Sequence, residues 1–224
     1  MSNNKKIQEP EVNVGEALSK TEKFFETYKN HIVYGSIAVI AVVAIALLYH
    51  NFIALPAQQE SLAQTFTAEQ YFRAGEYEKA LNGDGNALGF NQIISEYGTK
   101  SGEAVYFYAG VCELQLGNYK EAAEYLKKYK GSDAIMSARA IACTGDAYAG
   151  LNDYKAAAAE YVKAAKYADN LFAAAYLLKA GIMYEELGES AKALEMYEEI
   201  KSKYPQSAEG YDINKYISRI QNTK

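Results

Sequence analysis

The sequence predicts an all-α protein in which one transmembrane helix is followed by an α-solenoid of about three to four helix-turn-helix repeats and a C-terminal capping helix. Three observations favour this fold class. Residues 30–59 contain no Asp, Glu, Lys or Arg, and three later segments align with one another at a regular spacing. Half of the 224 residues are hydrophobic and only three are Pro, as expected of packed helices.

The apolar stretch is densest from Ile32 to Tyr49. A helix needs about 20 such residues to cross a hydrocarbon layer about 30 Å thick, and a buried helix of a soluble protein usually keeps a polar stripe. Tyr34 lies near one end of the stretch and Phe52 near the other, where aromatic rings favour the membrane–water interfaces. We therefore expect a transmembrane signal anchor at 31–53, uncleaved because Pro56 occupies the place of a small-x-small cleavage site.

The lysines predict the orientation of this span. Five precede it (Lys5, Lys6, Lys20, Lys23 and Lys29), and no Lys or Arg follows it before Arg73. Because positive charge is enriched on the cytoplasmic side, we expect residues 1–30 in the cytoplasm and 54–224 outside it. Residues 1–13 are polar and we expect them to be mobile. Residues 14–30 are amphipathic, and they either lie on the membrane surface or extend the membrane helix without a break.

Repeats follow the span at Glu103–Gly131, Ala138–Tyr167 and Ala174–Tyr204. Each copy predicts two helices that cross closely, with small residues on both and a bulky residue filling the space beside the crossing. The corresponding positions are Gly110, Gly145 and Gly181, then Ala122, Ala157 and Ala193, and finally Leu126, Tyr161 and Tyr197. A degenerate fourth copy spans 68–81 and is followed by an insertion at 82–86 that we interpret as a turn and not as a calcium loop.

This pattern resembles the tetratricopeptide repeat, whose 34-residue unit carries small residues and aromatics at these offsets. Pro205 stands at the usual proline position of that repeat. After it, Ile213, Tyr216, Ile217 and Ile220 recur at helical spacing. A helix with one apolar face at this place predicts a cap that shields the end of the solenoid from water.

The sequence argues against an enzyme. Both histidines, His31 and His50, flank the span, so the domain at 54–224 has none for acid–base chemistry, a catalytic triad or a histidine-containing zinc site. No P-loop, G-x-S-x-G or C-x-x-C motif occurs. The net charge of −5 argues against nucleic-acid binding. We therefore expect no metal, no cofactor and no small-molecule substrate.

Cys112 and Cys143 fall on the first helices of neighbouring repeats, about one turn out of step. A disulfide and two separate buried thiols are both compatible with this placement, and we favour the buried thiols.

A binding surface is the remaining candidate for function. In tetratricopeptide arrays the first helices line a concave groove, and the family's groove positions carried over to this sequence are apolar enough to suit an extended or helical apolar peptide. The side chains expected there are Phe107, Val111, Leu114, Gln115, Arg139, Asp146, Leu178, Ile182 and Glu185. The alternative is that the domain's own N-terminal repeat or its cap covers some of them.

The layout of a lysine-bearing segment, one span and a repeat domain resembles the YfgM-type ancillary subunit of the SecYEG translocon. This resemblance implies a non-enzymatic adaptor in the bacterial inner membrane, with translocon subunits, periplasmic chaperones or secreted chains as partners. Two other classes stay open: a scaffold for cell-envelope assembly, and an organelle import receptor of opposite topology, which the lysine distribution disfavours. A track of small residues on the span (Gly35, Ala38, Ala41 and Ala44) is weak support for helix pairing.

Overall fold

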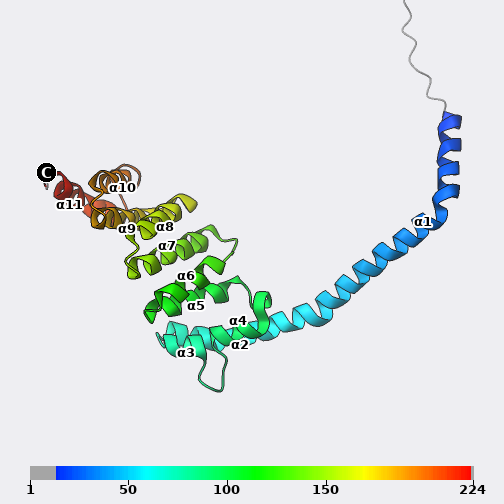
Figure 1. The fold of residues 1–224 in the computed structure, drawn as a ribbon, viewed down its shortest axis with the longest axis horizontal. Helices are drawn as coiled ribbons and strands as arrows, with labels where there is room; N and C mark the ends of the chain where they lie inside the picture. Colours follow the sequence, from blue (N-terminus) through cyan, green and yellow to red (C-terminus); the bar gives the residue numbers. More distant parts are fainter. Residues whose placement is uncertain (1–13, 223–224) are drawn as a thin grey trace, which may run out of the picture. The chain divides into compact units, whose positions relative to one another are not determined.

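The computed structural model describes residues 14–222, with side chains from residue 22 onward apart from that of Thr99 (Figure 1). The expected mobility of residues 1–13 concerns a segment outside this range. The chain forms two compact units, of which the first ends at Leu55 and the second begins at Pro56. All the elements in the described range are helical, which confirms the predicted fold class.

The first unit consists of α1 (Val14–Tyr49) and a π-helical turn at His50–Ala54. Because α1 is unbroken, the amphipathic segment at 14–30 continues directly into the apolar stretch, as in the second of the two alternatives. Apolar side chains on α1 are exposed, for example Ile40 and Val42. The continuous helical stretch from Glu22 to Arg73, 52 residues, takes in most of α1, the π-helical turn and the helix that follows the turn, and it is long and apolar enough to cross a membrane.

The second unit begins with α2 (Leu55–Arg73), α3 (Tyr77–Asn82), α4 (Phe90–Tyr97) and a 3-10 turn at Gly98–Ser101. Three helix pairs follow, and each helix contacts the next one along the chain (Figure 1). The pairs are α5 (Glu103–Gln115) with α6 (Tyr119–Lys128), α7 (Ala134–Gly150) with α8 (Tyr154–Tyr167), and α9 (Phe172–Glu186) with α10 (Ser190–Lys203). These pairs are the predicted repeats.

The repeated glycines mark where paired helices touch. A Cβ atom added to Gly110 would lie 2.6 Å from Leu126 Cγ, and one added to Gly181 would lie 2.2 Å from Tyr197 Cε1. Such distances are well inside van der Waals contact, so only glycine lets the helices approach this closely. Gly145 has the same relation to Tyr161, at 2.8 Å. The spacing pattern in the sequence therefore predicted the helix crossings correctly.

The turns inside the three pairs share one backbone conformation. Gly117, Asn152 and Gly188 occupy equivalent places and have φ angles of 83°, 60° and 72°. These left-handed values suit glycine and asparagine, and they let the last carbonyl groups of each first helix be capped. In the second pair, Asp153 then caps α8 by accepting a hydrogen bond from Ala156 N at 3.0 Å.

The insertion after α3 forms a turn around one carboxylate. Asp84 Oδ1 accepts hydrogen bonds from the backbone N–H groups of Ala87 at 2.7 Å and Asn86 at 2.9 Å, and Tyr71 OH donates to Asp84 Oδ2 at 2.7 Å. These bonds, led by that of Ala87, lower the pKa of Asp84 to about 2. The carboxylate is thus used as a structural acceptor, in line with the expected turn.

The final helix, α11 (Ala208–Asn222), covers the end of the array as predicted. Ile213, Ile217 and Ile220 are buried in one cluster with Ile200. Tyr216 packs its ring 5.3 Å from the ring of Tyr197. The apolar face of α11 therefore closes the core of the last pair.

Candidate protein-binding groove

The first helices of the three pairs bound a hollow of about 470 Å³. Each of α5, α7 and α9 contributes side chains from several successive turns, so the hollow crosses all three helices. Its lining residues are Val111, Leu114, Gln115, Ile135, Arg139, Ala142, Cys143, Asp146, Phe172, Tyr176 and Lys179. We refer to this surface as the groove.

Two large apolar side chains in the groove are open to solvent. Phe172 is 58% exposed and Ile135 is 48% exposed. Leu114 and Val111 are half-buried on the neighbouring helix α5. Solvent-exposed apolar side chains that gather in a concave site are typical of surfaces that bind apolar groups of another molecule.

Five of the nine residues expected in the binding groove line this hollow: Val111, Leu114, Gln115, Arg139 and Asp146. Leu178, Ile182 and Glu185 lie on α9 but are not among its lining residues. Leu178 and Ile182 are half-buried. Apart from Phe107, the structure thus brings together the expected residues of α5 and α7, while those of α9 lie outside this hollow.

Phe107 differs most from the expectation of a groove contact, because only 4% of it is exposed. Its ring lies 5.9 Å from that of Tyr129, and the guanidinium of Arg139 lies 6.0 Å from its centre. Arg139 therefore covers Phe107 and itself faces the groove. The ring supports the guanidinium through cation–π attraction.

The groove includes residues that the repeat alignment placed outside the repeats. Ile135 and Phe172 precede the expected starts at Ala138 and Ala174, but α7 begins at Ala134 and α9 at Phe172. Asp133 marks the true start of α7, since its carboxylate accepts a hydrogen bond from Met136 N at 2.7 Å. An acidic cap residue directly before an apolar helix was the sequence signal for this extra turn.

Asp146 is the polar centre of the groove. Tyr161 OH donates to Asp146 Oδ1 at 2.7 Å, and Lys179 Nζ lies 2.6 Å from the same oxygen. Burial, and then the adjacent carboxylate, raise the pKa of Tyr161. The tyrosine is therefore a fixed hydrogen-bond donor at neutral pH, and Asp146 is held by α8 and α9 together.

The two cysteines are free and do not form a disulfide. Cys112 is buried and Cys143 is half-buried in the groove. Burial, with a smaller contribution from Asp146, raises the pKa of the Cys143 thiol to about 11. A protonated thiol is a poor nucleophile, so Cys143 acts here as a small apolar lining group.

Glu185 does not line the groove and takes part in a second, partly exposed cluster of polar side chains. Tyr197 OH donates to Glu185 Oε1 at 2.5 Å, and Arg219 of the cap lies 2.6 Å from the same oxygen. Its carboxylate is thus engaged in joining α9 to α10 and α11. Among the residues that the structure describes, no group of three or more His, Cys, Asp or Glu side chains could hold a metal ion.

The helix pairs define a class: an α-solenoid of helix-turn-helix repeats, an architecture whose concave surfaces typically serve protein–protein interaction. Family models of the tetratricopeptide repeat match residues 94–134 and 175–207. The solved structure of MamA resembles this chain with a TM-score of 0.51 and 22% sequence identity, over 69% of this chain and 92% of that one. At this identity the likeness concerns the fold alone. No curated protein matches the chain at a significant level.

Proposed function

We propose that this protein is a membrane-anchored adaptor that holds an apolar segment of a protein partner in the groove. The observation that carries the proposal is the pair of exposed apolar side chains, Phe172 and Ile135, beside a lining of half-buried Val111 and Leu114. An extended peptide or one face of a helix could bury them. Arg139 and Gln115 at the same surface offer hydrogen bonds to the backbone or carboxylates of such a segment.

The anchor in this proposal is the apolar helix, which spans the bacterial inner membrane with its N-terminus in the cytoplasm. Its length, its composition and its exposed apolar side chains support this arrangement. The five lysines before the span favour a periplasmic repeat domain. The working partners are then translocon subunits, periplasmic chaperones or secreted chains, and the adaptor assists export or folding there. The second candidate is a scaffold for cell-envelope assembly.

Photo-crosslinking in living cells tests the groove. Probe amino acids at Phe172, Ile135 and Leu114 should capture partner proteins, because these side chains face the hollow. A matched probe at Tyr211, which is 77% exposed on the cap, controls for mere accessibility. Crosslinks from the groove but not from Tyr211, to translocon subunits, chaperones or nascent secreted chains, support the export adaptor.

Capture of envelope-assembly proteins from the same probes would favour the scaffold and remove the translocon assignment. Equal capture from the groove and from Tyr211 would overturn the groove as the working surface. Protease treatment of intact spheroplasts tests the topology separately, since a periplasmic repeat domain is digested and a cytoplasmic one is protected.

A further inference from the structure

A second hollow of about 470 Å³ lies among α6, α7 and α8. Helix α7 lines both this hollow and the groove, but with different residues, so the two sites are distinct. The groove takes Arg139, Ala142 and Asp146, whereas this second pocket takes Ser137, Ala140, Ile141 and Thr144. It is therefore a separate site, formed by α6, the turn that follows it, α7 and α8.

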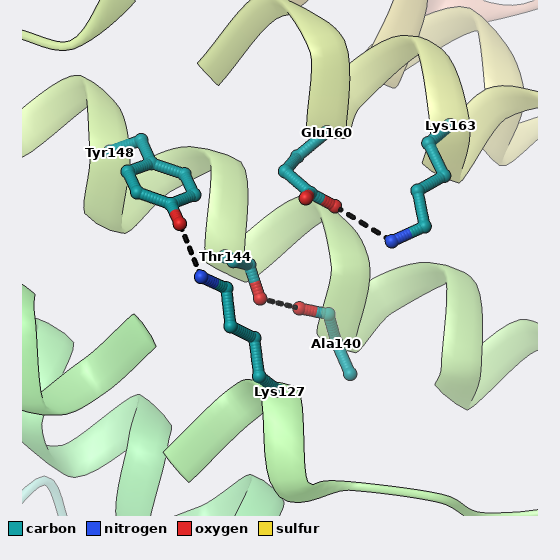
Figure 2. Close-up of polar contacts among 6 residues, drawn as sticks. All are labelled: Lys127, Ala140, Thr144, Tyr148, Glu160 and Lys163. Carbon is teal, nitrogen blue, oxygen red and sulfur yellow. Dashed lines mark hydrogen bonds and ion pairs between the residues drawn. The ribbon is translucent and has the colours of Figure 1, made fainter. Parts of the chain in front are cut away.

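The floor of this pocket is apolar, and the hydroxyl groups that α7 contributes to it already have acceptors. Leu126 and Ala140 are 2% and 3% exposed. Thr144 Oγ1 donates to Ala140 O at 2.9 Å (Figure 2), and Ser137 Oγ donates to Gly131 O at 2.9 Å. The floor thus accommodates an apolar group, and the protons of these two hydroxyl groups are already donated to backbone carbonyls.

The rim is basic in a protein that is acidic overall. Lys127, Lys130 and Lys163 line the pocket, and Glu160 is the one acid among its described lining residues. Glu160 engages Lys163 at 3.2 Å, which leaves the ammonium groups of Lys127 and Lys130 in excess. With a net charge of −5 for the whole chain, this local excess of positive charge is a distinct feature.

Lys127 is held in place by an aromatic partner. Its ammonium group donates a hydrogen bond to the hydroxyl of Tyr148 on α7 (Figure 2) and lies 4.8 Å from the centre of that ring. Because the tyrosine oxygen accepts this bond, its own proton remains available to a further acceptor. Tyr148 itself is not a lining residue of the pocket, so the donors that a carboxylate would meet at the rim are the lysine ammonium groups.

We propose that this pocket binds the carboxyl-terminal end of a polypeptide whose last residue is apolar. The terminal carboxylate pairs with Lys127 and Lys130, and the last side chain lies on Leu126 and Ala140. The charge of the rim matches a single carboxylate, and the volume is in the range of about 300–1,000 Å³ that suits small ligands. Inorganic phosphate could meet the same lysines, but it has no apolar part to lie on Leu126 and Ala140.

The test uses the full chain in detergent and a fluorescein-labelled peptide, Gly-Ser-Gly-Ser-Gly-Ala-Leu, with a free carboxyl terminus. Fluorescence anisotropy should show saturable binding below about 1 mM, and amidation of the terminus should weaken it about tenfold or more through loss of the charged hydrogen bonds. The double variant Lys127→Ala with Lys130→Ala should show a similar loss. Inorganic phosphate should compete poorly.

A matched double variant, Lys120→Ala with Lys155→Ala, removes two exposed lysines of α6 and α8 that lie outside the pocket and should leave the affinity unchanged. Phe172→Ala in the groove should also leave it unchanged, which separates this site from the proposed function. Equal binding of the amidated peptide, an equal loss in the control variant or no binding up to about 1 mM would each overturn the proposal.

Discussion

Lys179 Nζ lies 2.6 Å from Asp146 Oδ1, although the two residues belong to different repeats. Tyr161, from the second helix between them, donates to the same oxygen. The arrangement recurs one repeat later, where Arg219 and Tyr197 meet at Glu185. A carboxylate on one first helix thus ties together its own partner helix and the next helix of the array.

Removing the carboxylate of Asp146 should lower the free energy of unfolding more than removing the ammonium group of Lys179. In Asp146→Ala, the buried hydroxyl of Tyr161 loses its acceptor, and we expect the free energy of unfolding to fall by about 1–3 kcal/mol. In Lys179→Ala, a side chain that is 46% exposed is lost, and we expect a fall of at most about 1 kcal/mol. Urea unfolding followed by circular dichroism measures both. Equal losses would mean that the tyrosine bond contributes little.

The close helix crossing at Gly181 predicts a steric penalty. In Gly181→Ala the new methyl group would lie 2.2 Å from the ring of Tyr197, so the helices must separate, and we expect a loss of about 1–3 kcal/mol. Ala159→Ser adds one atom on an exposed face of α8 and should change stability by less than about 0.5 kcal/mol. The prediction fails if both variants unfold at the same urea concentration.

The raised thiol pKa values predict slow labelling of the folded protein. Burial raises the pKa of Cys112 to about 12 and that of Cys143 to about 11. At neutral pH both are protonated, so a thiolate-specific disulfide reagent should react far more slowly with the native chain than with the urea-unfolded chain. Rapid stoichiometric labelling of the native protein at pH 7.5 would contradict this prediction.

The same burial predicts a loss of stability in alkali. Thiols and phenols ionise at about pH 8.5 and 10 in the unfolded chain, but the folded state holds Cys112, Cys143, Tyr161 and Tyr197 protonated to higher pH. Above about pH 9 the unfolded state therefore binds fewer protons, and the free energy of unfolding should fall as pH rises. Urea unfolding between pH 7 and 11 measures the slope.

Tyr161→Phe provides the control for this slope. Because phenylalanine does not ionise, the variant should lose less stability between pH 9 and 11 than the parent chain, even if it starts lower. An identical pH profile in both proteins would show that Tyr161 does not contribute.

The sequence by itself determined the helical repeats, because their signal is local. Glycine and a bulky residue recur at fixed offsets, as in Gly145 with Tyr161, and they meet in the structure as the spacing predicts. The apolar stretch before the repeats likewise predicted a long apolar helix, and the spacing of the isoleucines near the C-terminus predicted the capping helix. Helical periodicity assigns each residue to a face, and these features depend on the face alone.

Only the tertiary structure decided what covers each face. Phe107 is on the expected side of α5, yet Arg139 from the next repeat lies over it. The early start of α7 adds Ile135 to the groove, and the pocket beside Lys127 exists because α6, α7 and α8 meet there. Exposure and ion pairing depend on neighbours that are distant in sequence, so no periodicity within one helix encodes them.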